Sequence, residues 1–316
     1  MVPAICASDI ARLEHAGSRD AQKGKQFARE FDCSKSGSYE AVLADPDVDA
    51  VYISTPPALH ELWVRAAAEQ GKHILCEKPA FPNLQTAREL ITLCQRRGVR
   101  LMEGYMFSYH PQHAVVESLI KEGRIGEPRV IQAEFTMPQP VEGSFRLQKE
   151  LGGGVFTDAS GYPVAAAMFL FKTLPASVYC RIETDAATGV DNAVSILLNF
   201  PGGGIAHALA AYGLYYRSRY SVLGSKGRIE AARAFSVLPD VETKIIVETA
   251  SGVETIPVAP ADQFRLMLED FCVQITKPAA SSGVFEENLL RQHTVMEAAR
   301  LSHLRQKPVL LSEFSK

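Results

Sequence analysis

The first hundred residues alternate short apolar runs with amphipathic segments. Runs at 13–17, 48–54, 73–76 and 99–102 read as strands. A helix is expected after Ser18-Arg19-Asp20 through Phe27, and apolar side chains recur at helical spacing in 59–70 and 87–97. Gly71 and Gly98 end two of these helical segments. The β-branched run at 48–54 is typical of a strand buried on both faces of a parallel sheet. This rhythm predicts a doubly wound, parallel α/β sheet.

The pattern changes after about residue 125. Closely spaced strands are expected at 129–136, 177–184, 193–200, 205–212, 220–223, 244–249 and 253–258, with helices at 162–171, 262–274 and 286–304. Glycine-rich turns at 201–204 and 224–227 separate several strands. Such punctuation predicts an α+β domain with a large, mostly antiparallel sheet. We therefore expect two domains, 1–107 and 108–316.

Composition excludes several classes of protein. A net charge of −3 gives no reason to expect nucleic-acid binding. No apolar run approaches the roughly 20 residues that cross a bilayer, and the first residues do not resemble a signal peptide. The six cysteines form no Cys-x-x-Cys pair, which predicts reduced thiols and a cytoplasmic protein. His110 and His113 could form a metal-binding pair, but no carboxylate–histidine cluster completes it, so no metal site is expected.

Three segments of the first domain fall where strands end, the edge at which open α/β sheets bind ligands. They are Ser18-Arg19-Asp20, Thr55-Pro56 with His60, and Glu77-Lys78-Pro79. A lysine at such an edge is informative, because its ammonium group is costly to desolvate unless something uses its charge. The alternative is that Lys78 pairs with Glu77 or reaches water.

The second domain contributes a glycine-rich segment, residues 152–163. Its glycines allow the backbone to approach a ligand closely. Asp158 and Tyr162 are four residues apart and would share a face if one helix covered both. A tyrosine beside a lysine has its phenolate favoured, which suits proton transfer. The alternative is a helix cap at Asp158 and a core tyrosine at Tyr162.

Together, these segments and Gly104-Tyr105-Met106-Phe107, which leads to His110-Pro111, resemble the glucose–fructose oxidoreductase / inositol dehydrogenase family. That family includes the dimeric dihydrodiol dehydrogenases. The resemblance covers nearly the whole chain, with 45–53 and 71–75 adding to it. It implies a nicotinamide-dependent oxidoreductase acting on a secondary alcohol or ketone of a sugar, polyol or cyclic diol. The first domain would be a Rossmann-type dinucleotide-binding domain. The second would bind substrate and form homodimers or homotetramers through its open sheet face.

The resemblance also implies roles for individual residues. Lys78 would lie by the nicotinamide and touch the reacting hydroxyl. Tyr162, at a position where many members carry histidine, would be the general acid/base, and Asp158 would bind substrate or orient the pair. Tyr105 and Phe107 would border the substrate pocket. The remaining cofactor contacts would come from Ser18, Arg19, Thr55, Pro56, His60 and Glu77.

Ser18-Arg19 follows the strand at which this family reads the adenosine ribose. An acidic residue there suits the free 2′-hydroxyl of NAD, whereas serine and arginine suit a 2′-phosphate. We therefore expect NADP rather than NAD as the cofactor. The alternative is that Arg19 pairs on the surface with Asp20 or Glu14.

The sequence departs from the family at its start. The family opens with a strand and a Gly-x-Gly-x-x-Gly turn that binds the pyrophosphate, but the first glycine here is Gly17. One explanation is a misplaced start codon or a truncation, so that the natural protein has the turn. The other is that the protein has genuinely lost it. We expect weakened cofactor binding in both cases. Genuine loss would favour an alternative function, an inactive relative that binds a ligand or serves as a partner subunit.

Overall fold

The computed structural model describes residues 1–277 and 283–314. The chain forms two compact units, each built from segments distant in sequence. Unit 1 comprises Met1–Phe81, Gln85–Gly104 and Phe264–Leu289, and unit 2 comprises Pro82–Leu84, Tyr105–Gln263 and Leu290–Lys316.

Unit 1 alternates helices and strands, as the sequence predicts. In chain order its elements are α1 (Val2–Cys6), β1 (His15–Gly17), α2 (Ala21–Glu30), β2 (Lys35–Gly37), α3 (Tyr39–Ala44), β3 (Ala50–Ile53), α4 (His60–Glu69), β4 (His73–Cys76), α5 (Leu84–Arg97), β5 (Leu101–Glu103) and α9 (Gln263–Ile275). Gly71 and Gly98 follow α4 and α5 with φ values of 71° and 69°, the left-handed conformation that ends helices. Asp20 caps α2 by accepting hydrogen bonds from the backbone of Gln22 and Lys23.

All strand pairs of unit 1 are parallel, and they form two separate sheets. β1 pairs with β2, and the other three strands lie in the order β3-β4-β5. Residues of β4 and β5 are almost all buried, as the apolar runs predict. The parallel α/β class is therefore confirmed, although the five strands do not form one continuous sheet.

A buried ion pair joins the segment 264–289 to the earlier residues of unit 1. The Arg100 guanidinium donates from Nε and Nη2 to the two carboxylate oxygens of Glu286, at 2.9 and 3.0 Å. The same carboxylate accepts the backbone N–H of Leu101. Because both side chains are almost fully buried, each charge needs the other to compensate for its loss of hydration.

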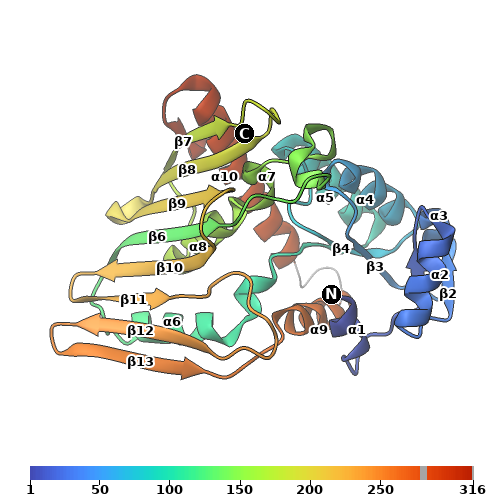
Figure 1. Cartoon of the computed structure of the whole chain (residues 1–316), viewed down its shortest axis with the longest axis horizontal. Coiled ribbons are helices and arrows are strands. Elements are labelled where there is room, and N and C mark those ends of the chain that lie inside the picture. The colour runs from blue at the N-terminus through green and yellow to red at the C-terminus, as the bar shows by residue number, and fades with distance from the viewer. Residues whose placement is uncertain (278–282, 315–316) are drawn as a thin grey trace. The chain divides into compact units, whose positions relative to one another are not determined.

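Unit 2 contains a nine-stranded sheet in the order β13-β12-β11-β10-β6-β9-β8-β7-β14 (Figure 1). Its strands are β6 (Pro128–Thr136), β7 (Ser177–Thr184), β8 (Asp191–Asn199), β9 (Ile205–Ala211), β10 (Arg217–Gly224), β11 (Gly227–Ala231), β12 (Thr243–Thr249), β13 (Gly252–Val258) and β14 (Val309–Leu310). Its helices are α6 (Pro111–Lys121), α7 (Val155–Asp158) and α8 (Gly161–Phe171), with most of α10 (Val284–Arg305). The β6–β9 pair is parallel and the other described pairs are antiparallel, so the predicted sheet is confirmed.

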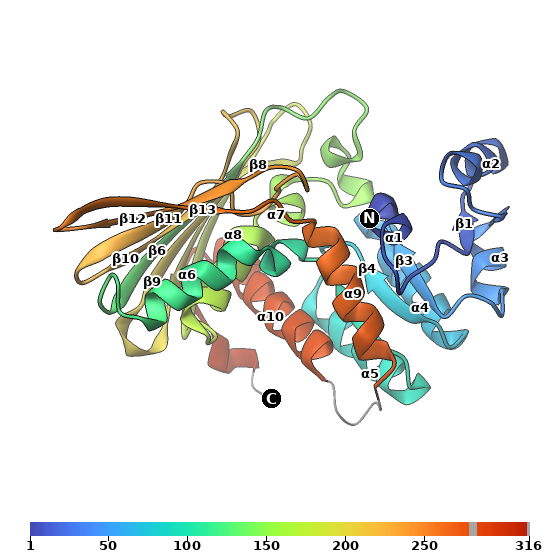
Figure 2. The same cartoon turned by 90° about the horizontal axis from the view of Figure 1, so that it is seen from below.

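One face of this sheet carries the core of unit 2. Ile131, Ala133 and Phe135 of β6 are buried, while the residues between them are half-buried or exposed. α8 is buried on most sides and contacts β6 and β9, and α6 contacts β12. Figure 2 shows α6 and α8 on the same side of the sheet. This one-sided packing explains the alternating burial along the strands.

Several helices and strands of the structure were not predicted from the sequence. β2 has the sequence Lys-Ser-Gly and lacks an apolar signal, and α3, α6 and β11 are likewise not predicted. Asp158 and Tyr162 would share a helix face only if one helix covered both, and that condition is not met. Asp158 ends α7, whereas α8 begins at Gly161 after Ser160, so Asp158 caps neither helix.

Candidate active site

The predicted site residues divide between the two units. Unit 1 holds the seven residues expected to contact the cofactor, and unit 2 holds the four others: Tyr105, Phe107, Asp158 and Tyr162.

In unit 1, two predicted segments lie at the same sheet edge. β3 and β4 are parallel neighbours with Ile53 opposite Cys76, and the backbone N–H of Glu77 donates to the Ile53 carbonyl at 2.9 Å. The turn that begins with Thr55-Pro56 and the segment Glu77-Lys78 therefore emerge side by side at the carboxyl ends of their strands. The Thr55 hydroxyl oxygen is buried and has no hydrogen-bond partner in the described part of the chain.

His60 links these two segments from inside. Its ring is 1% exposed, with Nδ1 2.9 Å from the Pro79 carbonyl and Nε2 2.7 Å from the Thr55 carbonyl. Both ring nitrogens therefore engage backbone of the two segments that end β3 and β4. His60 holds the segments together rather than presenting its ring to solvent.

Carboxylates fix the backbone around Lys78. Glu77 accepts hydrogen bonds from the Tyr52 hydroxyl at 2.5 Å and from the Lys78 backbone N–H at 3.3 Å. Glu103, at the end of β5, accepts the Ala80 backbone N–H at 2.8 Å. The next residue, Gly104, passes so close to β4 that an added Cβ would lie 3.3 Å from the Cys76 carbonyl oxygen. The sequence analysis did not identify Glu103, which follows an apolar strand and resembles a surface acid in the sequence alone.

Ser18 and Arg19 lie directly after β1. The Ser18 hydroxyl accepts the Asp20 backbone N–H at 3.1 Å, while Arg19 is exposed. The two proposed surface partners of Arg19 are otherwise occupied, because Asp20 caps α2 and Glu14 pairs with Arg12 and Lys35. No ion pair forms between Arg19 and any residue that the structure describes.

In unit 2, Tyr162 lies within an aromatic cluster. Its ring meets those of Tyr105, Phe107 and Phe135 edge to face, with centroids 5.3, 6.0 and 5.2 Å away. Its hydroxyl donates to the Met106 sulfur at 3.4 Å, a weak acceptor. Because Phe107 is 1% exposed, it supports the Tyr162 ring from within. A Cβ at Gly161 would collide with the Tyr105 hydroxyl, so the glycine makes room for that side chain.

Asp158 is buried and held by two donors. Its Oδ2 accepts Arg146 Nε at 2.7 Å and the Tyr212 hydroxyl at 3.1 Å. Burial, followed by the neighbouring Asp158 carboxylate, raises the pKa of Tyr212 well above its usual range, so this phenol stays protonated and donates. The sequence analysis identified neither Arg146 nor Tyr212, because neither lies near the glycine-rich segment in a recognisable motif.

Two glycines of the 152–154 run, Gly153 and Gly154, approach other parts of the chain closely. A Cβ at Gly153 would lie 2.5 Å from the Phe145 carbonyl oxygen and 2.6 Å from that of Arg146. Gly154 has φ 110°, and a Cβ there would collide with the Asp191 carboxylate. The run thus packs the turn that carries Arg146 against the start of α7.

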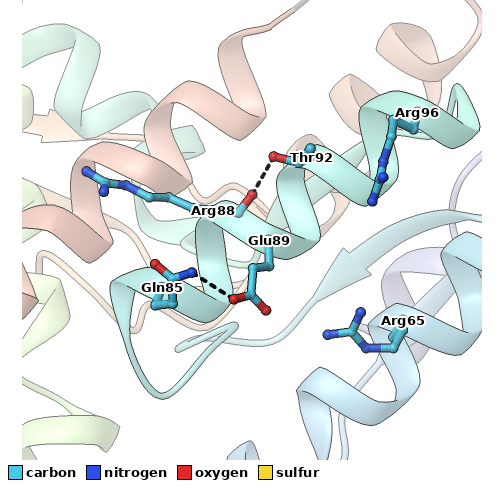
Figure 3. Close-up of a pocket in the computed structure, with 6 residues that line it drawn as sticks. All are labelled: Arg65, Gln85, Arg88, Glu89, Thr92 and Arg96. Atoms are coloured by element: carbon cyan, nitrogen blue, oxygen red, sulfur yellow. Dashed lines mark hydrogen bonds between the residues drawn. The ribbon is translucent and has the colours of Figure 1, made fainter. Parts of the chain in front are cut away.

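A separate groove lies in unit 1 on α4 and α5, lined by Arg65, Gln85, Arg88, Glu89, Thr92 and Arg96. Gln85 donates to the Glu89 carboxylate, and the Thr92 hydroxyl donates to the Arg88 carbonyl (Figure 3). None of the predicted site residues lines this groove.

Comparison with known proteins defines the class. Residues 2–105 match the model of an oxidoreductase family with an NAD-binding Rossmann fold, and residues 113–230 match the GFO/IDH/MocA C-terminal domain. The chain is a nicotinamide-dependent dehydrogenase or reductase. It belongs to the GFO/IDH/MocA oxidoreductase family, which confirms the resemblance, the enzyme class and the nicotinamide cofactor.

Individual relatives match over most of their length. A dTDP-3,4-didehydro-2,6-dideoxy-alpha-D-glucose 3-reductase from Saccharopolyspora spinosa is 35% identical, over 94% of this chain and 91% of the relative. D-xylose 1-dehydrogenase (NADP(+)) 2 from Haloferax volcanii is 34% identical, over 86% and 83%. Among solved structures, the 3-ketoreductase KijD10 from Actinomadura kijaniata, in complex with NADP and TDP-benzene, is 30% identical. It matches with a TM-score of 0.91, over 95% of this chain and 92% of that one.

No described helix is both long and apolar enough to cross a membrane. No cluster of three or more histidine, cysteine or acidic side chains in residues 1–277 and 283–314 could hold a metal ion.

Proposed function

We propose that the protein is an NADP-dependent oxidoreductase that interconverts a ketone and a secondary alcohol on a sugar, polyol or cyclic diol. The observation that carries this proposal is that a chain of this family keeps Lys78 just after β4 and Tyr162 in α8, beside the Tyr105 and Phe107 rings. Relatives that reduce a dTDP-linked keto-sugar or oxidise xylose support a sugar-type substrate.

The proposed chemistry assigns proton movement to the protein and hydride movement to the nicotinamide, which supplies or accepts the hydride when bound. Tyr162 donates its phenolic proton to the ketone oxygen during reduction and accepts it during oxidation. The Lys78 ammonium donates a hydrogen bond to that oxygen and stabilises the negative charge that develops there. Asp158 and Tyr105 contact the substrate, and Phe107 supports the Tyr162 ring.

Solved variants of a relative support the choice of these two residues. The 3-ketoreductase from Actinomadura kijaniata has been solved with one tyrosine changed to phenylalanine and, separately, with one lysine changed to alanine. Those two positions are separated by the same number of residues as Lys78 and Tyr162. This spacing is what the proposal expects if the two pairs correspond.

The residues of unit 1 fit a phosphorylated dinucleotide. Arg19 is exposed after β1 and suits a 2′-phosphate, with the Ser18 hydroxyl beside it in sequence. The buried Thr55 hydroxyl, which lies next to Pro56 after β3, could form a hydrogen bond with the dinucleotide. Glu77 and Lys78 follow β4 at the same edge, and His60 acts by holding both segments in place.

We further propose the domain roles and the assembly. Residues 1–107 would bind the dinucleotide, and 108–316 would bind substrate and form a homodimer or homotetramer. The sheet face opposite α6 and α8 supports this assembly, since it presents Leu197 and Ile205, each more than one third exposed, among ion pairs such as Arg219–Glu134. The six free cysteines support a cytoplasmic location.

An absorbance assay of NADPH oxidation and NADP reduction tests the proposal. The panel contains dTDP-linked keto-sugars, aldoses, inositols and trans-dihydrodiols, each in the redox state that can react. We expect turnover with at least one sugar-type compound and a preference for NADPH over NADH. No turnover with any compound, by a folded protein that binds NADPH, would contradict the proposal.

A further inference from the structure

Arg146 is a charged residue that contacts Asp158, and the proposed reaction gives it no role. Arg146 lies in a 3-10 turn (Phe145–Leu147), remote in sequence from Lys78 and 12 residues before Asp158. Its Nε donates to Asp158 Oδ2 at 2.7 Å, and its side chain is 41% exposed. One end of this ion pair is therefore buried, and the other is open to solvent.

The backbone of Arg146 is fixed more firmly than that of an ordinary surface arginine. Its carbonyl accepts the Gly154 N–H at 2.9 Å, and its N–H donates to the Ser144 hydroxyl at 3.3 Å. Gly153 packs against the same carbonyl at a distance that no Cβ could occupy. The guanidinium also lies over the Phe145 ring, 5.0 Å from its centroid. These contacts orient the Arg146 guanidinium toward the Asp158 carboxylate.

Arg146, Asp158 and Tyr212 form one hydrogen-bonded cluster around the Asp158 carboxylate. Tyr212 donates to the same Asp158 oxygen that receives Arg146, so two donors converge on Oδ2. Burial alone would lower the pKa of Arg146, but Asp158 raises it above its ordinary value, with smaller contributions from Tyr212 and Tyr162. The guanidinium therefore acts electrostatically on the Tyr162 phenol as well as on Asp158.

The charge of Arg146 matters because Asp158 lies close to Tyr162 in the fold: the Tyr162 N–H donates to the carbonyl of Ala159, the residue after Asp158, at 3.2 Å. A buried, uncompensated carboxylate would disfavour loss of the phenolic proton, whereas a neighbouring guanidinium favours it. In unit 2, the described contacts bring the following titratable and charged groups to Tyr162, Asp158 or their partners: Arg146, Tyr212 after β9, Tyr105 before α6, and Asp191 from β8, which acts on Tyr212. Arg146 is the cation among them.

We propose that Arg146 is a positioning residue of the reaction. It holds the Asp158 carboxylate in place together with Tyr212, and it compensates that carboxylate's charge, so that Tyr162 can exchange its proton. This inference rests on the proposed role of Tyr162 as the acid/base group. It adds a residue that acts through Asp158 and Tyr162 without touching the substrate itself.

The test compares pH profiles of kcat for wild type, Arg146→Met and Arg146→Lys, with Arg129→Met as the matched surface control. We expect Arg146→Met to lower kcat by about 10- to 100-fold, within the range of proton-transfer effects. The limb of its profile that reports the acid/base group should move to higher pH, while KM for NADPH stays unchanged. Arg146→Lys should recover part of kcat and most of the profile, and Arg129→Met should behave as wild type.

The outcomes separate this inference from the proposed function. If Arg146→Met keeps the wild-type kcat and pH profile while Tyr162→Phe loses activity, the role of Arg146 is wrong and the proposed function stands. If the wild type itself has no turnover, the proposed function fails first. Should Arg146→Met not fold, Tyr212→Phe removes the second donor to Asp158 but keeps the ring. A kcat and profile for Tyr212→Phe equal to wild type would also overturn the inference.

Discussion

The exposed guanidinium of Arg19 follows β1, and the neighbouring acids already have other partners. We predict that Arg19→Ala raises KM for NADPH by about 10- to 100-fold, since a hydrogen bond to a charged group contributes roughly 1.5–3 kcal/mol. KM for NADH should change little. Steady-state kinetics with both cofactors would measure this, with Arg29→Ala in α2 as the control. An equal rise in KM for the two cofactors would mean that Arg19 does not read the 2′-phosphate.

Single residues differ in how far the sequence reveals them. Lys78 and Tyr162 stand in motifs with fixed spacing, so the sequence nominates them. Arg146, Tyr212 and Glu103 act through contacts with residues at other places in the chain, and nothing local marks them. The sequence also does not show that Gly153 packs against the Arg146 turn and that Gly154 packs against Asp191, because both contacts join separate parts of the chain.

At the scale of elements, α6 carries a histidine buried against β10. His113 Nδ1 lies 2.8 Å from the Tyr220 hydroxyl and Nε2 lies 3.1 Å from the Ala234 carbonyl. Burial lowers the pKa of His113 to about 3. The folded protein therefore keeps this imidazole neutral where an unfolded chain would protonate it.

The sign of the resulting pH dependence follows from this lowered pKa. Between the ordinary value of about 6.5 and the folded value, the unfolded state binds more protons, so stability is full above 6.5 and falls as pH decreases. Between pH 6.5 and 5 this histidine should cost about 2 kcal/mol of unfolding free energy. The free energy of unfolding in urea, measured at several pH values, should depend less on pH in His113→Gln than in wild type. Parallel curves for wild type and His113→Gln would contradict this account.

Elements with strong apolar periodicity were predictable, and those without it were not. β4 and β7 match the predicted ranges, because buried or alternating apolar residues define them. β2 is polar throughout, and its pairing with β1 gives no sequence signal. α8 begins one residue before the predicted helix at 162–171 and ends with it, whereas the short α7 before it has no sequence signal of its own.

At the scale of the whole molecule, the sequence predicted two kinds of sheet in the right order. It could not predict that Phe264–Leu289 belongs to unit 1, because that placement involves contacts between residues far apart in the chain, such as the Arg100–Glu286 pair, and not a local pattern. The separation of β1-β2 from β3-β4-β5 likewise appears only in the strand pairing.

Assembly through the nine-stranded sheet can be tested by adding one charge to its open face. Leu197 of β8 is 38% exposed there, and Leu197→Glu would place a carboxylate in the proposed interface, where an unpaired charge is costly. We expect light scattering to give a dimer or tetramer mass for wild type and for Leu62→Glu in α4, but a monomer mass for Leu197→Glu. A monomer mass for wild type would exclude the proposed assembly.

The central claim is that Lys78 and Tyr162 carry the proton chemistry of an NADP-dependent oxidoreductase. The most direct test is turnover by Lys78→Ala and Tyr162→Phe, with Lys121→Ala and Tyr179→Phe as matched controls. We expect each site variant to lose about 10²-fold or more in kcat, as for other proton-transfer groups, with NADPH still bound. The double variant should lose little more than the worse single variant, because both residues serve one step. Near-normal turnover by both single variants would contradict the claim.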